Sequence, residues 1–317
     1  MKYLNLKRII FIVALTLLIY IFGITYFDIQ GVFHLLKDYS SNIFLLILLA
    51  VLISQVFMFL RFLYYLKTLR IKSSFKDNVL IYFSSWAMFF APAKSGELIK
   101  SFLLKKIYDI PYRSSTPIIL MEQLCDLIVV IFFICFGLVL GFFNMAFFWL
   151  IVILILILSI IFLFSNKSFL IFLLRTVNKI NFFKKFQLQD TFYAINHLVK
   201  PKRLIVALLL SFGYWFCAST VLYLVVVGFN GNISLIKALF AFPASIIIGL
   251  LSTIPGGIGV TEGSLFALLK SQGISGMVAS ASVIVTRIFT LWLGAIVGIF
   301  ALLKLNGKLN GKLNSNK

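Results

Sequence analysis

Long apolar runs without a single charge constrain this chain more than any other feature. The longest covers residues 127–166, and a bilayer core about 30 Å thick needs roughly 20 apolar residues in a helix. Of the 317 residues, 62% are hydrophobic and 12% are charged, whereas soluble domains carry about 25% charged residues. One soluble core cannot bury so many apolar residues. A water-soluble enzyme is therefore excluded, and an all-α polytopic membrane protein is predicted.

About six transmembrane helices are predicted from these runs. Residues 127–166 are long enough for parts of two helices with a turn near residues 141–145. The other four predicted spans cover about residues 9–27, 43–60, 204–228 and 276–303, and only the last of these four contains a charge, Arg287. The first of them follows three basic residues but lacks a small-residue cleavage site. It is therefore interpreted as a retained anchor and not as a signal peptide.

Two further apolar segments, about 78–110 and 236–272, are interrupted by proline and glycine. Irregular backbone at membrane depth is tolerated only where protein buries it or water lines it. Each segment is therefore predicted to be a re-entrant helical hairpin that returns to the side from which it entered. The whole of residues 1–303 is then a single integral membrane domain.

The excess of positive charge predicts the orientation. Lysine and arginine number 29 against 9 acids, a net charge of +20. With both termini in the cytoplasm, most basic residues fall on the cytoplasmic side of the inner (plasma) membrane, as the positive-inside rule requires. This includes an amphipathic basic loop at residues 165–203 and a tail at residues 304–317, which is predicted to be disordered. Topology explains the charge, so no nucleic-acid partner is predicted.

The two broken segments resemble each other. Pro92 to Glu97 and Pro255 to Glu262 both carry Pro-x3-Gly before the acid, and Leu-Leu-Lys follows each. Glu262 lies 165 positions after Glu97, and Arg287 lies 165 positions after Glu122. The orientation above places the two motifs on opposite sides of the membrane. The pattern predicts an inverted repeat, about 43–143 and about 204–303, of the kind that builds transporter sites at the bilayer midplane.

Arg287 is the most informative single residue, because it has sixteen uncharged residues on each side. A charge at the bilayer centre costs about 2.5–3.5 kcal/mol on insertion scales, so it must face protein, a ligand or water. Glu122, its equivalent in the repeat, is the expected partner. Asp126 lies one helical turn further along and is a second candidate partner or a cation or proton site. A purely structural ion pair remains the alternative.

The remaining candidates belong to the two motifs. Lys94 and Lys100 could hold phosphate, although positive-inside bias explains them about equally well. The glycines allow tight turns close to a ligand. The predicted substrate-binding residues are Lys94, Gly96, Glu97, Lys100, Glu122, Asp126, Pro255, Gly256, Gly257, Gly259, Glu262 and Arg287. The three cysteines and two histidines show no metal-ligand spacing. No metal, cofactor or catalytic residue is predicted.

At these residues the chain resembles the lysylphosphatidylglycerol synthase transmembrane-region family of flippase-like membrane proteins. The resemblance lies in Pro92–Lys100, the acidic helix segment Met121–Asp126, Pro255–Glu262 and Arg287. Members commonly have Glu-Arg where this chain has Glu122-Gln123, so the charge balance of a central site differs here. In the aminoacyl-phosphatidylglycerol synthases this region is joined to a soluble transferase. This sequence ends without one, so the resemblance implies lipid handling without lysyl transfer.

The sequence thus predicts a non-enzymatic, flippase-like transporter that binds an anionic or lipid-linked headgroup between the hairpins and moves it between leaflets. Two other classes remain. One is a scaffold or accessory subunit of an envelope-lipid or glycan biosynthesis enzyme, docked through the loop at residues 165–203. The other is an intramembrane enzyme with Glu122 and Asp126 as acid and base, for which the chain offers no nucleophile.

Overall fold

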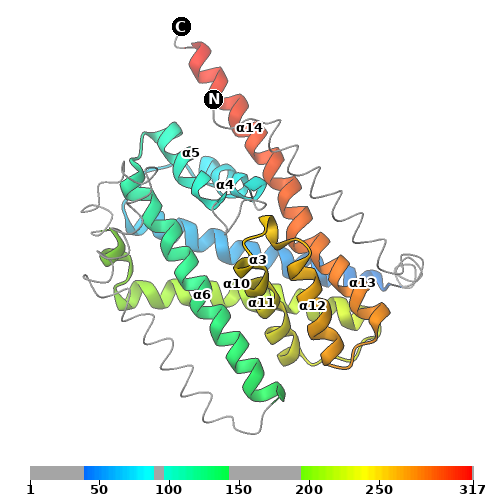
Figure 1. Ribbon diagram of the computed structural model, residues 1–317. Helices are drawn as coiled ribbons and strands as arrows, with labels where there is room; N and C mark the ends of the chain where they lie inside the picture. Colours follow the sequence, from blue (N-terminus) through cyan, green and yellow to red (C-terminus); the bar gives the residue numbers. More distant parts are fainter. Residues whose placement is uncertain (1–38, 89–95, 143–193, 316–317) are drawn as a thin grey trace. The chain divides into compact units, whose positions relative to one another are not determined.

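A computed structural model describes residues 39–88, 96–142 and 194–315, and its elements are helical (Figure 1). In chain order they are α3 Ser41–Thr68, α4 Phe75–Ser84, the 3-10 helix η1 Ser85–Met88, α5 Ile99–Tyr108, α6 Tyr112–Phe142, α10 Pro201–Gly228, α11 Leu235–Leu251, the 3-10 turn η3 Pro255–Gly257, α12 Val260–Ser271, α13 Gly276–Arg287, the π-helix η4 Ile288–Trp292 and α14 Leu293–Ser315.

Within these residues, 4 helical segments are long and apolar enough to cross a membrane. They are Ser41–Thr68, Tyr112–Leu140, Pro201–Gly228 and Gly276–Gly307. Three correspond to predicted spans, and Tyr112–Leu140 contains residues 127–140 of the long uncharged run. The predicted span at residues 9–27 and the remainder of the run at residues 127–166 lie outside the described residues. The chain is therefore a helical, multi-pass membrane protein.

Two of these helices extend well beyond the apolar runs that predicted them. α3 continues to Thr68 and so includes Arg61, the residue directly after the predicted span at residues 43–60. α6 begins at Tyr112, before Glu122 and Asp126, although the uncharged run starts at residue 127. A helix tolerates charges at membrane depth when other protein groups pair with them. The ends of an apolar run therefore did not mark the ends of these helices.

The C-terminal segment also differs from its prediction. α14 runs as far as Ser315, whereas residues 304–317 were predicted to be a disordered tail. A helix already nucleated by a long apolar span extends at little cost per residue, and Leu305 is buried. Of the predicted amphipathic loop, residues 165–193 lie outside the described part. α10 begins at Pro201, inside the predicted loop.

The chain divides into two compact units. Unit 1 comprises Met1–Ser54, Phe83–Glu97 and Phe216–Phe300, and unit 2 comprises Gln55–Tyr82, Leu98–Trp215 and Ala301–Lys317. Each unit takes residues from both predicted repeats, so the division does not follow the repeat boundary.

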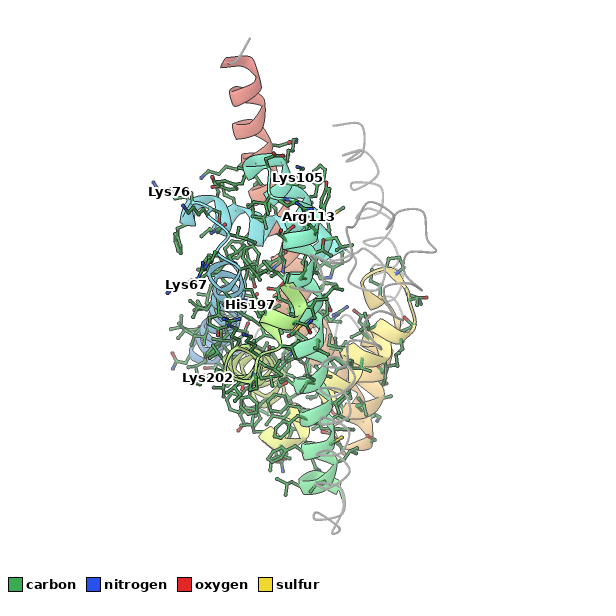
Figure 2. The ribbon with its side chains drawn as sticks, turned by 90° about the vertical axis from the view of Figure 1, so that its left-hand side faces the viewer. Lys67, Lys76, Lys105, Arg113, His197 and Lys202 are labelled. Carbon is green, nitrogen blue, oxygen red and sulfur yellow. The ribbon has the colours of Figure 1, made fainter. Side chains whose placement is uncertain are left out.

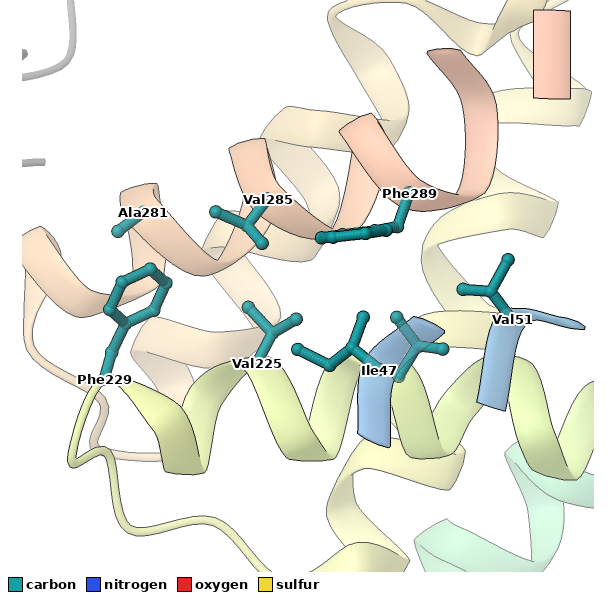
Figure 3. Packing of buried hydrophobic residues seen from close by; sticks show 8 residues of the cluster. Ile47, Val51, Val225, Phe229, Ala281, Val285 and Phe289 are labelled. Carbon is teal, nitrogen blue, oxygen red and sulfur yellow. The ribbon is translucent and has the colours of Figure 1, made fainter. Parts of the chain in front are cut away.

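The core of unit 1 is formed by apolar side chains from three helices. Ala281 and Val285 of α13 and Phe289 of η4 recur every four residues along continuous helical chain and so lie on one side of it. They pack on Val221 and Val225 of α10, on Phe229 directly after it, and on Ile47 and Val51 of α3 (Figure 3). The packing fixes α13, and with it the position of Arg287 two residues beyond Val285.

Unit 1 also contains the second broken segment, which is a helical hairpin. α11 and α12 pack against each other, and Gly249 of α11 meets Thr261 of α12 so closely that a Cβ there would overlap the threonine hydroxyl. The two ends of this segment lie close together. Gly231, before α11, and Val278, in α13, are so near that a Cβ on Gly231 would lie 3.0 Å from Val278 Cγ1.

The first broken segment shows two contacts of the same kind. In unit 1, a Cβ on Gly96 would overlap the carbonyl oxygen of Met88, so the chain on either side of residues 89–95 is brought together. In unit 2, Tyr108 at the end of α5 donates its hydroxyl to Asp77 Oδ2 in the first turn of α4, over 2.6 Å. The backbone N–H of Ser74 donates to the same hydroxyl over 2.8 Å. The chain from residue 74 to 108 therefore returns to its starting point.

Candidate functional site

Arg287 and Glu262 form a buried ion pair in unit 1. Arg287 Nε donates to Glu262 Oε1 over 2.5 Å, and the arginine and glutamate side chains are 4% and 10% exposed. The same carboxylate accepts from the backbone N–H of Gly259 through Oε2, over 2.7 Å. Glu262 is thus the third residue of α12 and caps its N-terminus, where a negative charge is favourable.

The turn before α12 supplies the second acceptor for Arg287. Gly256, Gly257 and Gly259 all have positive φ, at 65°, 65° and 80°, a conformation that glycine adopts at little steric cost. This turn directs the carbonyl of Gly256 toward the guanidinium, and Arg287 Nη2 donates to it over 3.1 Å. The π-helix η4 begins immediately after Arg287, and such segments are frequent at functional sites.

The guanidinium keeps unused hydrogen-bonding capacity. Arginine has five N–H donors, and Arg287 uses two of them in the bonds to Glu262 and Gly256. Within the described residues the other three have no acceptor. Two hydroxyls on the same helix, Ser282 Oγ and Thr286 Oγ1, are buried and likewise lack a hydrogen-bond partner there. A buried site with several unused donors fits an oxyanion such as phosphate.

A second buried ion pair lies in unit 2. Lys100 Nζ on α5 donates to Glu122 Oε2 on α6 over 2.7 Å, and their side chains are 2% and 0% exposed. The ammonium also lies 5.5 Å from the ring centroid of Phe62 and 5.6 Å from that of Tyr82. Cation–π contacts of this kind are strongest where water is excluded.

A third pair in unit 2 joins three helices. Arg61 of α3 donates from Nη1 to Asp126 Oδ1 of α6 over 2.5 Å and from Nη2 to Oδ2 over 3.3 Å. Arg61 also donates to the Ser211 hydroxyl of α10. The indole Nε1 of Trp215, on the same helix, donates to Asp126 Oδ1 over 3.3 Å. This network ties α3, α6 and α10 together inside the apolar part of unit 2.

The two predicted repeats use one arrangement with the charges exchanged. In the second, an acid in the first turn of α12 pairs with a cation on the following helix, 25 residues later. In the first, a cation in the first turn of α5 pairs with an acid on the following helix, 22 residues later. The two pairs are alike in kind but not in register, because Lys100 corresponds to Leu265 and not to Glu262 at the offset of 165. The inverted repeat therefore stays a prediction.

The predicted partnership between Glu122 and Arg287 stays a prediction, because the two residues belong to different units. Within its own unit Arg287 pairs with Glu262, and Glu122 pairs with Lys100, each with a residue on the helix that directly precedes its own. Glu97 is buried. Lys94 lies outside the described residues, so its predicted role in binding phosphate stays a prediction.

Sequence reasoning missed Arg61, Ser211 and Trp215. The predicted span at residues 43–60 stopped just before Arg61. One signal could have corrected this, because the apolar stretch Phe62–Leu66 follows the arginine without a helix-breaking residue. The partners themselves carry no such signal, since Ser211 and Trp215 lie 150 and 89 positions from the residues they contact. Within the described residues, no group of three or more His, Cys, Asp or Glu side chains is placed to hold a metal ion.

Comparison with known proteins places these features in a family. The family model described as "Lysylphosphatidylglycerol synthase TM region" matches residues 8–298. The chain belongs to this family. A UPF0104 membrane protein of Methanocaldococcus jannaschii is 27% identical over 230 residues, which cover 66% of this chain and 67% of the relative.

Shorter matches reach other archaeal UPF0104 membrane proteins. One from Pyrococcus horikoshii is 31% identical over 110 residues, 35% of this chain and 32% of the relative. One from Methanothermobacter thermautotrophicus is 27% identical over 106 residues, 33% of this chain and 31% of the relative. This chain spans about a third of the length of these two relatives, whose names give a membrane location and no activity.

Proposed function

We propose that this protein is a flippase-like transporter that moves a lipid with an anionic, phosphate-bearing headgroup between membrane leaflets. The single observation that supports this most is the buried guanidinium of Arg287, 3% exposed in a span-forming segment, with N–H donors that the described residues leave unused. A phosphate oxyanion accepts from an arginine in the bidentate geometry that such a fork offers.

The geometry suggests how a headgroup would enter and leave. A phosphate that approaches Arg287 would compete with the carboxylate of Glu262 for the guanidinium. Glu262 would not be left without a partner, because its Oε2 still accepts from the N–H of Gly259 and lies at the positive end of the α12 dipole. Because Glu262 keeps this second partner, replacing it at the guanidinium with phosphate costs less free energy than breaking an isolated buried ion pair. In the absence of lipid, Glu262 therefore occupies the place at the guanidinium that the headgroup phosphate would take.

The re-entrant hairpins are the second part of this proposal. Both broken segments return to their starting points, as the contacts of Tyr108 with Asp77 and of Gly231 with Val278 indicate. We propose that they enter the plasma membrane from opposite sides, with both termini in the cytoplasm. Inverted repeats with broken helices support alternating access in transporters. The protein then acts by binding and conformational change, without covalent chemistry.

A leaflet-specific transfer assay tests the proposal. Purified protein is reconstituted into vesicles with fluorescent phosphatidylglycerol, and dithionite quenching reports the lipid in the outer leaflet over time. Wild-type protein should transfer lipid faster than protein-free vesicles. Arg287→Ala should slow transfer about tenfold or more, because a hydrogen bond to a charged group contributes about 1.5–3 kcal/mol.

The matched control is Lys105→Ala, which removes an exposed lysine from an ion pair with Asp109. It should transfer lipid at the wild-type rate. Transfer no faster than in protein-free vesicles would overturn the proposal, and so would undiminished transfer by Arg287→Ala.

A further inference from the structure

A basic patch lies in unit 2 where two of the apolar helices end. Lys67 is in the last turn of α3 and Arg70 follows the helix, while Lys200, Lys202 and Arg203 stand at the start of α10. The juxtamembrane basic patch is defined here by these five residues. In Figure 2, Lys67, His197 and Lys202 are labelled in neighbouring parts of the view.

The two chain segments approach each other in unit 2, where Arg61 of α3 donates to the Ser211 hydroxyl of α10. Burial, together with the positive charges of Arg203, Lys200 and Arg70, lowers the pKa of His197 from its ordinary value of 6.5. Arg203 also donates from Nη1 to the backbone carbonyl of His197 over 2.6 Å. The positive-inside rule requires basic residues on one side of the membrane. It does not require them to gather against their mutual repulsion.

The position on α10 increases the positive potential further. The N-terminus of a helix carries a partial positive charge, which favours acids and disfavours bases in the first turn. α10 has no acid in its first turn, and Lys202 and Arg203 lie within that turn. Such an arrangement is stabilised by an external anion, because helix N-termini and clustered bases both attract phosphate.

Arg70 adds a separate observation. It ends α3 with φ 55°, in a C-terminal cap where the N–H of Arg70 donates to the carbonyl of Lys67 and that of Ile71 to Leu66, over 3.0 Å and 2.9 Å. Glycine is the usual residue at such a left-handed position, because a side chain there is strained. This chain keeps a charged side chain at a position where glycine would relieve the strain.

We propose that the juxtamembrane basic patch binds the phosphate groups of anionic phospholipids in the adjacent leaflet. Basic clusters directly beside spanning helices attract anionic lipid, with about 1 kcal/mol for each lysine or arginine near the surface. The patch lies at the ends of α3 and α10, where headgroups are within reach. This binding does not depend on lipid transfer, so it goes beyond the proposed transport function.

The test is a lipid titration followed by native mass spectrometry. Purified protein in non-ionic detergent is titrated with phosphatidylglycerol and, separately, with phosphatidylcholine of the same chain length. The variant Arg70→Gly removes a patch charge while relieving the strained backbone. It should keep or gain thermal stability and bind phosphatidylglycerol about fivefold more weakly, as expected for the loss of one charge. Lys202→Gln provides a second variant with the same expected loss.

Two controls make the result specific. Lys270→Gln removes a basic residue from the end of α12 in unit 1 and should leave binding unchanged. Arg287→Ala should retain the patch-dependent binding even if it abolishes lipid transfer, which separates this proposal from the transport proposal. The proposal is overturned if both patch variants bind phosphatidylglycerol as wild type does, or if phosphatidylcholine binds equally well. Undiminished lipid binding together with charge-dependent capture of an acidic protein would assign the patch to a protein partner.

Discussion

At the scale of single residues, Arg61, Lys100 and Arg287 show how this chain holds cations among apolar helices. Each is paired with a carboxylate at 2.5–2.7 Å, and each receives at least one further polar or aromatic contact. Two of the pairs, in unit 2, join neighbouring helices around Phe62 and Trp215. Arg61 Nε also lacks a hydrogen-bond partner within the described residues, so unused donors alone do not single out Arg287. The third pair differs because it lies beside a turn of three glycines with positive φ, and this position makes Arg287 the candidate binding group.

We expect the Arg61–Asp126 pair to be structural. Asp126→Ala leaves a guanidinium of 0% exposure without its counterion, and breaking a buried pair in this way typically costs 3–5 kcal/mol. The free energy of unfolding in mixed micelles should fall by about this amount. The double variant Arg61→Met with Asp126→Leu should recover most of it, because no buried charge remains.

Lys105→Ala is the surface control, since Lys105 and its partner Asp109 are both solvent-exposed and such pairs contribute little. Equal destabilisation by the single and the double variant would show that Arg61 and Asp126 are not energetically coupled.

At the scale of elements, the α11–α12 hairpin depends on small residues at its point of closest approach. Gly249→Ala would place a Cβ on the hydroxyl of Thr261, and overpacking of this kind costs about 1–3 kcal/mol. Thermal unfolding should show the loss, and Thr261→Ala should restore part of it in the double variant. Gly263→Ala on α12 is the matched control, because a Cβ there meets nothing within 4 Å and alanine favours the helix.

The sequence predicted the elements better than their ends and their contacts. Apolar runs located α3, α10 and the α13–α14 segment, and the Pro and Gly positions located the break between α11 and α12. Hydropathy could not place Arg61 inside α3, because the burial of that charge depends on Asp126 of α6. The repeat singled out Glu122 and Arg287, but it could not give their partners, which follow from how each hairpin packs on the next helix. The helix at residues 304–315 was not predicted. The polar composition of these residues indicated disorder, but they continue the helix that the apolar part of α14 begins.

At the scale of the whole molecule, the inverted repeat predicts that the ends of the two hairpins face opposite sides of the membrane. Single cysteines at positions 105 and 270, in a chain whose Cys125, Cys135 and Cys217 are replaced by alanine, should react with an impermeant maleimide from opposite sides. Lys105→Cys should be labelled from the cytoplasmic side and Lys270→Cys from the outside. Labelling of both from one side would remove the inverted repeat from this account.

The central claim is that Arg287 serves a lipid headgroup and not only the packing of unit 1. The double variant Glu262→Gln with Arg287→Gln keeps a hydrogen-bonding side chain at each position, with the glutamine amide nitrogen where Arg287 Nε contacts residue 262. It removes both charges, so no unpaired buried charge remains and it should fold as well as wild type. Measured by dithionite quenching of fluorescent phosphatidylglycerol in vesicles, this variant should transfer lipid no faster than protein-free vesicles. Transfer at the wild-type rate by the folded double variant would contradict the claim.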